Sequence, residues 1–217
     1  MTVSKETKPP LSPLKRLTFF QQLETFDRDL AMICSVSSDE DANLACLRPI
    51  LKLLEISGHG IPWLLGVFVA MYYYNESDAY SFQIAFNILF ALVLDLIISG
   101  LLKAIVKRPR PATNACTEMF FVVSVDHYSF PSGHSTRAAT LAILAIVMLP
   151  LSLLAKYMLI VWMLAIAASR VMLGRHHVSD VIAGLFIGYL QALFVQAFWI
   201  KVSNVNDVLQ LAGMSFS

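Results

Sequence analysis

The sequence has 217 residues, a length that suits one domain, and 57% of them are hydrophobic while only 14% are charged. Soluble domains usually carry roughly 25% charged residues, so this shortfall and a mean hydropathy of +0.66 predict a surface that largely faces lipid. The formal net charge of +1 argues against a strongly basic nucleic-acid-binding protein.

Residues 1–56 are expected to form an N-terminal tail and an amphipathic helix. In the stretch LTFFQQLETFDRDLAMI, the side chains of Phe20, Leu23, Phe26 and Leu30 recur at helical spacing, and the charged residues lie mainly elsewhere around the helix. This pattern is typical of a helix that lies in the membrane interface. A helix packed on the rest of the protein is an equal alternative.

Five apolar segments further along the chain qualify or nearly qualify as membrane spans, which need roughly 20 mostly apolar residues. They run from about His59 to Tyr74, Phe82 to Leu102, Ser135 to Leu149, Lys156 to Ser169 and Val181 to Ile200. A single helix through the third and fourth segments would be about 58 Å long, nearly twice the hydrocarbon thickness. A tight helical hairpin around Pro150 is therefore favoured.

The expected fold is all-α, a polytopic transmembrane helix bundle of about five spans with an N-terminal interfacial amphipathic helix. Residues 57–201 are expected to form the transmembrane domain, and residues 202–217 a short C-terminal tail with little order.

Three polar clusters adjoin the expected spans, where charged groups are costly and often functional. The first, KAIVKRPRP, ends the second span and supplies Lys103, Lys107, Arg108 and Arg110, and its prolines stop the helix. A basic flank that only anchors the span at the lipid headgroups is the alternative.

The second cluster, Pro131-Ser132-Gly133-His134, begins the third span. A helix N-terminus presents unpaired backbone N–H groups, which favour an anion, and Gly133 allows an oxyanion to approach the backbone. A plain Ser132 N-cap beside an interfacial histidine is the alternative.

The third cluster, SRVMLGRHHVSD, connects the fourth and fifth spans and supplies Arg170, Arg175, His176, His177 and Asp180. If the segment is helical, His176 and Asp180 lie on one face, and a carboxylate bonded to one imidazole nitrogen leaves the other free to attack. A loop with interfacial basic residues is the alternative. Alternating spans predict that all three clusters share one membrane face.

Together these clusters resemble the three-part signature of the type-2 phosphatidic acid phosphatase superfamily. The matching positions are Lys103 with Arg110-Pro111, then Pro131-Ser132-Gly133-His134, then Ser169-Arg170 with His176 and Asp180. The resemblance covers at least residues 57–200. The stretches LLEISGHGIPW, YSFPSGHSTRAA and SRVMLGRHHVSD are similar to its presqualene and polyisoprenoid diphosphate phosphatase branch.

The resemblance implies a phosphohistidine mechanism in which His176 attacks phosphorus, Asp180 holds its ring and His134 protonates the leaving oxygen. The residues implied to bind the phosphoryl oxygens are Lys103, Arg110, Ser132, Gly133 and Arg170. His177 is the alternative nucleophile, and Arg137 and Asp95 are candidates to pair with each other. The absence of a carboxylate cluster at this face predicts catalysis without a metal or other cofactor.

The expected substrates are polyisoprenoid diphosphates and monophosphates of the presqualene and farnesyl type, with phosphatidate also accepted. Alternatives are a general phosphatidate or lysophosphatidate phosphatase, a membrane sugar phosphatase, an anion transporter and a catalytically silent scaffold. The expected partners are the lipid phosphate substrate and membrane lipids, not nucleic acid, and the oligomeric state is left open.

The distribution of basic residues predicts the orientation. The N-terminal flank is rich in lysine and arginine, whereas the opposite side carries Lys156, Lys201 and an acidic loop with Glu76 and Asp78. Because basic residues favour the cytoplasmic side, the tail and the catalytic face are expected in the cytosol. The expected location is a multi-pass position in the endoplasmic reticulum and nuclear envelope.

Overall fold

The computed structural model describes residues 18–75, 77–113 and 127–212, and within these ranges every regular element is helical. The α-helices are α1 (Phe19–Cys34), α2 (Arg48–Ser57), α3 (Gly60–Tyr74), α4 (Ala79–Val106), α5 (Gly133–Met148), α6 (Leu153–Met172), α7 (Val178–Ala197) and α8 (Val205–Leu211). A short 3₁₀ turn, η1 (Ala45–Leu47), precedes α2. The predicted all-α class is therefore confirmed.

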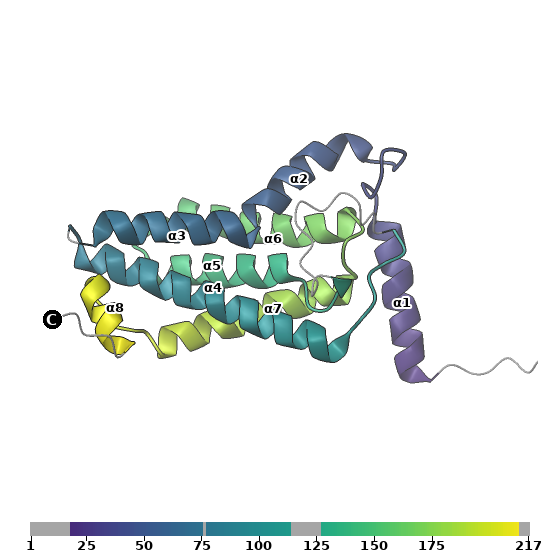
Figure 1. The fold of residues 1–217 in the computed structure, drawn as a ribbon. Coiled ribbons are helices and arrows are strands. Elements are labelled where there is room, and N and C mark those ends of the chain that lie inside the picture. Colours follow the sequence, from purple (N-terminus) through teal and green to yellow (C-terminus); the bar gives the residue numbers. More distant parts are fainter. Residues whose placement is uncertain (1–17, 76, 114–126, 213–217) are drawn as a thin grey trace, which may run out of the picture.

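Helices α3 to α7 lie side by side along one axis, α1 crosses one end of this bundle, and α8 lies at the other end (Figure 1). Successive helices alternate in direction, so the ends of α4 and α6 meet the starts of α5 and α7 next to α1. The predicted break between the third and fourth spans is present, because α5 ends at Met148 and α6 begins at Leu153.

Helix α5 is at the centre of the bundle and packs against α4, α6 and α7. Its approach to α7 is close enough to require glycine: a Cβ atom added at Gly188 would lie 2.2 Å from the carbonyl oxygen of Thr136. The hydroxyl of Thr140 donates to the carbonyl of Gly188 at 3.1 Å. This contact fixes α7 against α5, whose second residue is His134.

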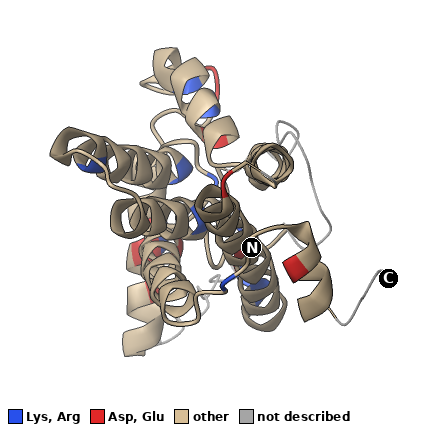
Figure 2. Cartoon of the chain, turned by 90° about the vertical axis from the view of Figure 1, so that its left-hand side faces the viewer, with Lys and Arg blue, Asp and Glu red and all other residues tan. Residues whose placement is uncertain are grey.

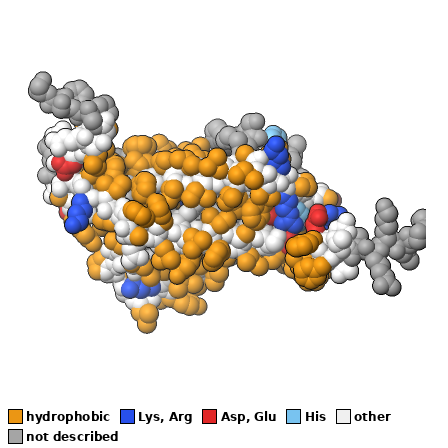
Figure 3. Space-filling model, turned by 90° about the horizontal axis from the view of Figure 1, so that it is seen from below, with side chains coloured by type: hydrophobic (Ala, Val, Ile, Leu, Met, Phe, Trp, Pro, Cys, Tyr) orange, Lys and Arg blue, Asp and Glu red, His pale blue; other side chains and the backbone are white. Residues whose placement is uncertain are grey.

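The outside of the bundle is apolar. Figure 3 shows hydrophobic side chains over the middle of the bundle, with charged side chains gathered towards its two ends. Figure 2 looks along the bundle from the end that carries α8, and most of the ribbon is tan, the colour of uncharged residues. An apolar belt between two polar ends is the surface that a lipid bilayer requires.

Three helices among the described residues, α4, α6 and α7, are long and apolar enough to cross a membrane, and α2 with α3 forms a fourth such unit bent by 44°. The expected third span, α5, has only 16 residues. Its first turn contains polar side chains and its far end stops before Pro150, and neighbouring helices cover much of its surface. A count of five equivalent spans is therefore too simple.

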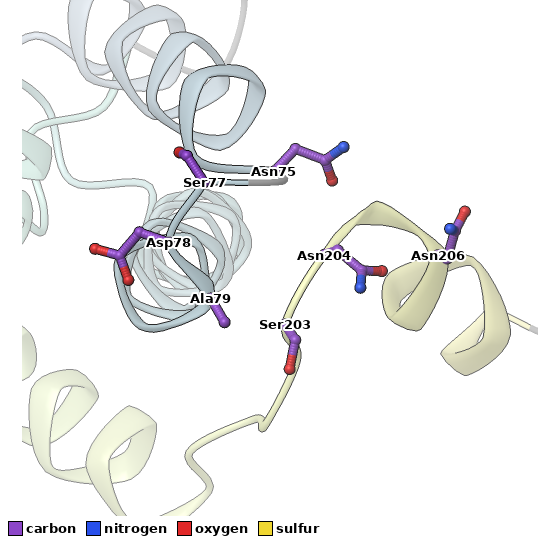
Figure 4. A pocket seen from close by; sticks show the side chains of 7 residues that line it. All are labelled: Asn75, Ser77, Asp78, Ala79, Ser203, Asn204 and Asn206. Carbon is purple, nitrogen blue, oxygen red and sulfur yellow. The ribbon is translucent and has the colours of Figure 1, made fainter.

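The expected N-terminal amphipathic helix is present as α1, whereas the C-terminal tail is more structured than expected. Thr18 and Gln21 form a capping box at the start of α1, which crosses the end of the bundle (Figure 1). The expected tail contains α8, where the amide of Val205 donates to the side-chain oxygen of Asn75 at 2.8 Å. A polar hollow of about 390 Å³ lies between this tail and the α3–α4 turn, lined by Asn75, Ser77, Asp78, Ala79, Ser203, Asn204 and Asn206 (Figure 4).

Candidate active site

The three polar clusters meet at the end of the bundle that α1 crosses. Backbone hydrogen bonds join them: the amide of Ser129 donates to the carbonyl of Arg108 at 2.9 Å, and the amide of Ser132 donates to the carbonyl of Asp180 at 3.1 Å. The prediction that the clusters share one face is therefore confirmed by contacts between residues far apart in the sequence.

Two helix N-termini and two basic side chains favour an anion between these clusters. Lys103 and Arg170 lie in the last turns of α4 and α6, where a positive side chain is stabilised by the helix dipole. Helices α5 and α7 begin at the same end and direct their N-terminal N–H groups there. The four helix ends thus bring two basic side chains and the N-termini of two helices to one place.

The ring of His176 is buried and held by the backbone. Its Nδ1 lies 2.7 Å from the carbonyl oxygen of Ser129, and the side chain is 2% exposed. Because a carbonyl oxygen only accepts, Nδ1 must carry the hydrogen, which leaves a lone pair on Nε2. Burial, followed by the positive charges of Arg110, Arg170 and Lys103, holds the pKa of this imidazole well below its ordinary value.

The expected direct bond between Asp180 and His176 is absent. His176 Nδ1 is 4.0 Å from Asp180 Oδ2, beyond hydrogen-bonding distance. The physical reason is that α7 begins only at Val178, so His176 precedes the helix and the four-residue spacing does not place the two side chains on one helical face. Asp180 Oδ2 instead lies 2.9 Å from the backbone nitrogen of His177 and 3.1 Å from its Nδ1.

His134 is the second residue of α5, and its Nε2 is buried without a hydrogen-bond partner among the described residues. Ser132 occupies the N-cap position, but its hydroxyl accepts from Ser135 at 2.9 Å rather than capping the helix. A Cβ atom added at Gly133 would meet no heavy atom within 4 Å, so open space adjoins this backbone. The second cluster is thus more than a simple helix cap.

Arg170 is fully buried and its guanidinium forms an ion pair with Glu55 at 3.2 Å. None of its three side-chain nitrogens makes a hydrogen bond with the described part of the chain. Beyond the ion pair with Glu55, buried guanidinium N–H groups without acceptors are unfavourable, and the oxygens of a phosphoryl group would satisfy them. Nearby, Arg110 donates to the carbonyl of Arg175 at 3.1 Å, and Lys103 is buried.

Arg137 and Asp95 do pair, as their positions suggested, at 2.9 Å. Arg137 also donates to the carbonyl of Gly58 at 3.2 Å, so it joins α4 and α5 to the turn between α2 and α3. Two acidic residues near the site were not anticipated from the sequence. These are Glu55, which pairs with Arg170, and Asp27 of α1, which pairs with Arg108 at 2.7 Å.

Comparison with known families identifies this architecture. The family model described as the PAP2 superfamily matches residues 84–203, which is more than half of the chain. The chain belongs to the PAP2 superfamily. It is an integral membrane protein, and the resemblance carried by the three clusters is confirmed at the level of the superfamily.

Curated PAP2 relatives cover most of the chain. A probable lipid phosphate phosphatase beta of Arabidopsis thaliana is 34% identical over 174 residues, which is 69% of this chain and 79% of that protein. Phosphatidylglycerophosphatase B of Bacillus subtilis is 28% identical over 71% of this chain and 74% of its own length. The finer resemblance to the presqualene branch stays a prediction.

Two crystal structures share the fold. The first transmembrane PAP2-type phosphatidylglycerolphosphate phosphatase from Bacillus subtilis superposes with a TM-score of 0.62 at 22% identity, over 82% of this chain and 86% of that one. Aquifex aeolicus LpxE superposes with a TM-score of 0.56 at 21% identity, over 78% and 93% of the two chains. At these identities the similarity shows a common fold.

Proposed function

We propose that this PAP2 protein is a lipid phosphate phosphatase that hydrolyses polyisoprenoid diphosphates and monophosphates, and also phosphatidate, through a phosphohistidine intermediate. One observation carries the proposal: the buried imidazole of His176 has its Nδ1 bonded to a backbone carbonyl, and the positive charges of Arg110, Arg170 and Lys103 act on the ring. A neutral nucleophile beside fixed cations is the arrangement that phosphoryl transfer to histidine needs.

In the proposed first step, Nε2 of His176 forms a bond to phosphorus while the bond from phosphorus to the leaving oxygen breaks. Nε2 of His134, which is buried and has no hydrogen-bond partner among the described residues, donates its proton to that oxygen. In the second step His134 takes a proton from water, the water oxygen attacks phosphorus, and inorganic phosphate leaves His176. Asp180, 4.0 Å from the ring, stabilises the positive charge that phosphorylation creates.

The remaining site residues are proposed to bind the three equatorial phosphoryl oxygens. Arg170 offers N–H groups without hydrogen-bond acceptors in the described chain, while Lys103 and Arg110 supply further positive charge. The hydroxyl of Ser132 and the amide of Gly133 lie at the start of α5, beside the open space described above. Because these groups are fixed before substrate binds, they stabilise the transition state without reorganisation.

The lipid nature of the substrate is supported by the position of the site. The cationic residues lie at the end of an apolar helix bundle, where a headgroup can reach them while its tail stays among apolar side chains. The preference for isoprenoid diphosphates rests on the sequence stretches that resemble the presqualene branch. The similarity to a probable lipid phosphate phosphatase favours the second candidate, a general phosphatidate or lysophosphatidate phosphatase.

A substrate panel on purified protein in detergent, with EDTA present, separates these functions. It compares polyisoprenoid diphosphates, isoprenoid monophosphates, phosphatidate, lysophosphatidate and glucose 6-phosphate, with His176→Ala as the inactive control. We expect phosphate release from the isoprenoid diphosphates at the highest kcat/KM and no loss of activity with EDTA. Efficient cleavage of phosphatidate without cleavage of isoprenoid diphosphates would favour the second candidate, and loss of activity with EDTA would refute the metal-independent mechanism.

A further inference from the structure

Helix α1 docks on the catalytic end of the bundle through a narrow face. Along α1, Asp27 and Ala31 are buried, and Cys34 packs against the apolar cluster formed by Ala167, Val171 and Val181. Elsewhere around the helix, apolar side chains are exposed, as expected for a helix at a lipid interface: Phe19, Phe20, Leu23, Phe26 and Ile33. Asp27 is the buried carboxylate of this helix, and its hydrogen bonds connect α1 to the catalytic end of the bundle.

Asp27 binds the first turn of α7. Its Oδ1 accepts the backbone N–H of Ser179 at 3.1 Å, and its Oδ2 accepts the hydroxyl of the same residue. Ser179 is the second residue of α7, and the N–H groups of a first turn have no partner within their own helix. A carboxylate from α1 therefore caps the helix that carries Asp180, and its charge suits the positive end of the helix dipole.

The same carboxylate holds Arg108, which links it to the active site. One terminal nitrogen of Arg108 donates to Asp27 Oδ2 at 2.7 Å, while the other donates to Asp180 Oδ1 at 2.6 Å and to the hydroxyl of Ser179 at 2.7 Å. Asp180 is fully buried, and its other oxygen receives the N–H of His177. A single guanidinium thus bridges two carboxylates 153 positions apart, Asp27 on α1 and Asp180 on α7.

Asp27 and Arg108 stabilise each other's charged forms. Burial raises the pKa of Asp27, but hydrogen bonds from Ser179 and Arg108 outweigh it, and the pKa is lowered overall. Burial likewise lowers the pKa of Arg108, and its bonds and charge interactions with Asp27 and Asp180 outweigh that effect and raise it. Asp27 and Arg108 are therefore charged at neutral pH.

We propose that Asp27 is a positioning residue of the active site: through Arg108 and Ser179 it holds the Asp180 carboxylate and the first turn of α7 in their catalytic geometry. The inference rests on the proposed phosphatase function for its kinetic consequence. Asp180 also accepts the amide of Ser132 through its backbone carbonyl, so a shift of this turn would move the second cluster as well. The active-site residues on the first turn of α7 therefore reach their catalytic positions only when α1 is docked.

Asp27→Asn tests the proposal, because it keeps the size of the side chain and an acceptor for the Ser179 amide but removes the charge that holds Arg108. Glu24→Gln is the matched control: Glu24 lies three residues earlier on α1 and pairs with Arg28 at 3.2 Å on the exposed side. We expect kcat of Asp27→Asn to fall roughly 10-fold to 100-fold, as for small displacements of catalytic groups, with KM nearly unchanged. Glu24→Gln should match the wild type.

Two further measurements separate positioning from a general loss of stability. In an Arg108→Gln background, Asp27→Asn should reduce kcat by less than about twofold, because the link it supports is already broken. Ser179→Ala, which keeps the backbone cap, should give a smaller loss of kcat and serves if Asp27→Asn does not fold. Equal effects of Asp27→Asn and Glu24→Gln, or full additivity of Asp27→Asn with Arg108→Gln, would overturn the proposal.

Hydrogen exchange makes the result independent of the proposed function. Peptides that contain residues 176–181 should exchange faster in Asp27→Asn than in wild type or in Glu24→Gln, because the first turn of α7 loses part of its support. Unchanged exchange would contradict the link between α1 and α7. If wild-type protein released no phosphate from any lipid, the proposed function would fail while the exchange experiment would still decide this inference.

Discussion

At the scale of single residues, substitutions of the two histidines of the site are expected to have different effects on the reaction. His134→Ala removes the proposed proton donor, so its effect should depend on how basic the leaving oxygen is. We predict that kcat falls roughly 10²-fold to 10⁴-fold with an isoprenoid monophosphate, whose alkoxide leaves poorly, and much less with p-nitrophenyl phosphate. Parallel kinetics with both substrates measure this, and equal losses would contradict the role given to His134.

The protonation state of His176 gives a second residue-scale prediction. Its pKa is held well below the ordinary value by burial and neighbouring cations, so the neutral ring should persist as the pH falls through 6.5 and should gain a proton only at lower pH. ¹⁵N NMR of histidine-labelled protein, with His176→Ala for assignment, reports protonation and tautomer directly. We expect the neutral Nδ1–H form at pH 6.0, and a protonated ring at that pH would contradict the geometry.

The residues proposed to bind substrate were named from the sequence, whereas the acidic residues that pair with Arg170 and Arg108 were not. The signature positions are close in sequence within each cluster, so motif spacing found them. Glu55 and Asp27 reach the site from helices far away in the chain, and their pairing depends on how α2 and α1 dock. The predicted bond from Asp180 to His176 was wrong because spacing alone does not show where α7 begins.

At the scale of elements, the closeness of α5 and α7 should be sensitive to one methyl group. A Cβ atom at Gly188 would lie 2.2 Å from the carbonyl oxygen of Thr136, so Gly188→Ala should force the helices apart and destabilise the protein by roughly 1–3 kcal/mol. Gly100→Ala is the control, because its Cβ atom would meet nothing within 4 Å and alanine favours a helix. Thermal unfolding in detergent compares them, and equal melting temperatures would contradict the packing.

Long apolar helices were predictable from hydropathy, whereas short or buried ones were less so. Helices α4 and α6 extend the predicted spans at both ends, and α7 both begins and ends a few residues earlier than the predicted span. Helix α5 carries polar residues such as Thr136 and Thr140, whose hydroxyls donate to backbone carbonyls of the same helix. Hydropathy alone therefore gives a weaker signal for this helix than for its neighbours. The C-terminal α8 is stabilised by an Asn204 cap and by Asn75 of a distant turn, a contact that local sequence does not reveal.

At the scale of the whole molecule, the two ends of the chain are expected on opposite sides of the membrane. Helix α1 lies at the catalytic end of the bundle and α8 at the other end (Figure 1). Because the N-terminal flank is rich in basic residues, we predict that α1 and the site face the cytosol. Selective permeabilisation, with one tag before Met1 and another after Ser217, should reveal the first before the second. A lumenal N-terminal tag, or both tags on one side, would contradict this orientation.

The central claim is that phosphate passes through His176. The most direct test is to mix purified protein with its best ³²P-labelled substrate from the panel, quench under alkaline conditions that preserve phosphohistidine, and map the labelled residue. We predict label on Nε2 of His176 in the wild type and in His177→Ala, and no label in His176→Ala. Label on His177, or labelled and active His176→Ala protein, would contradict the account.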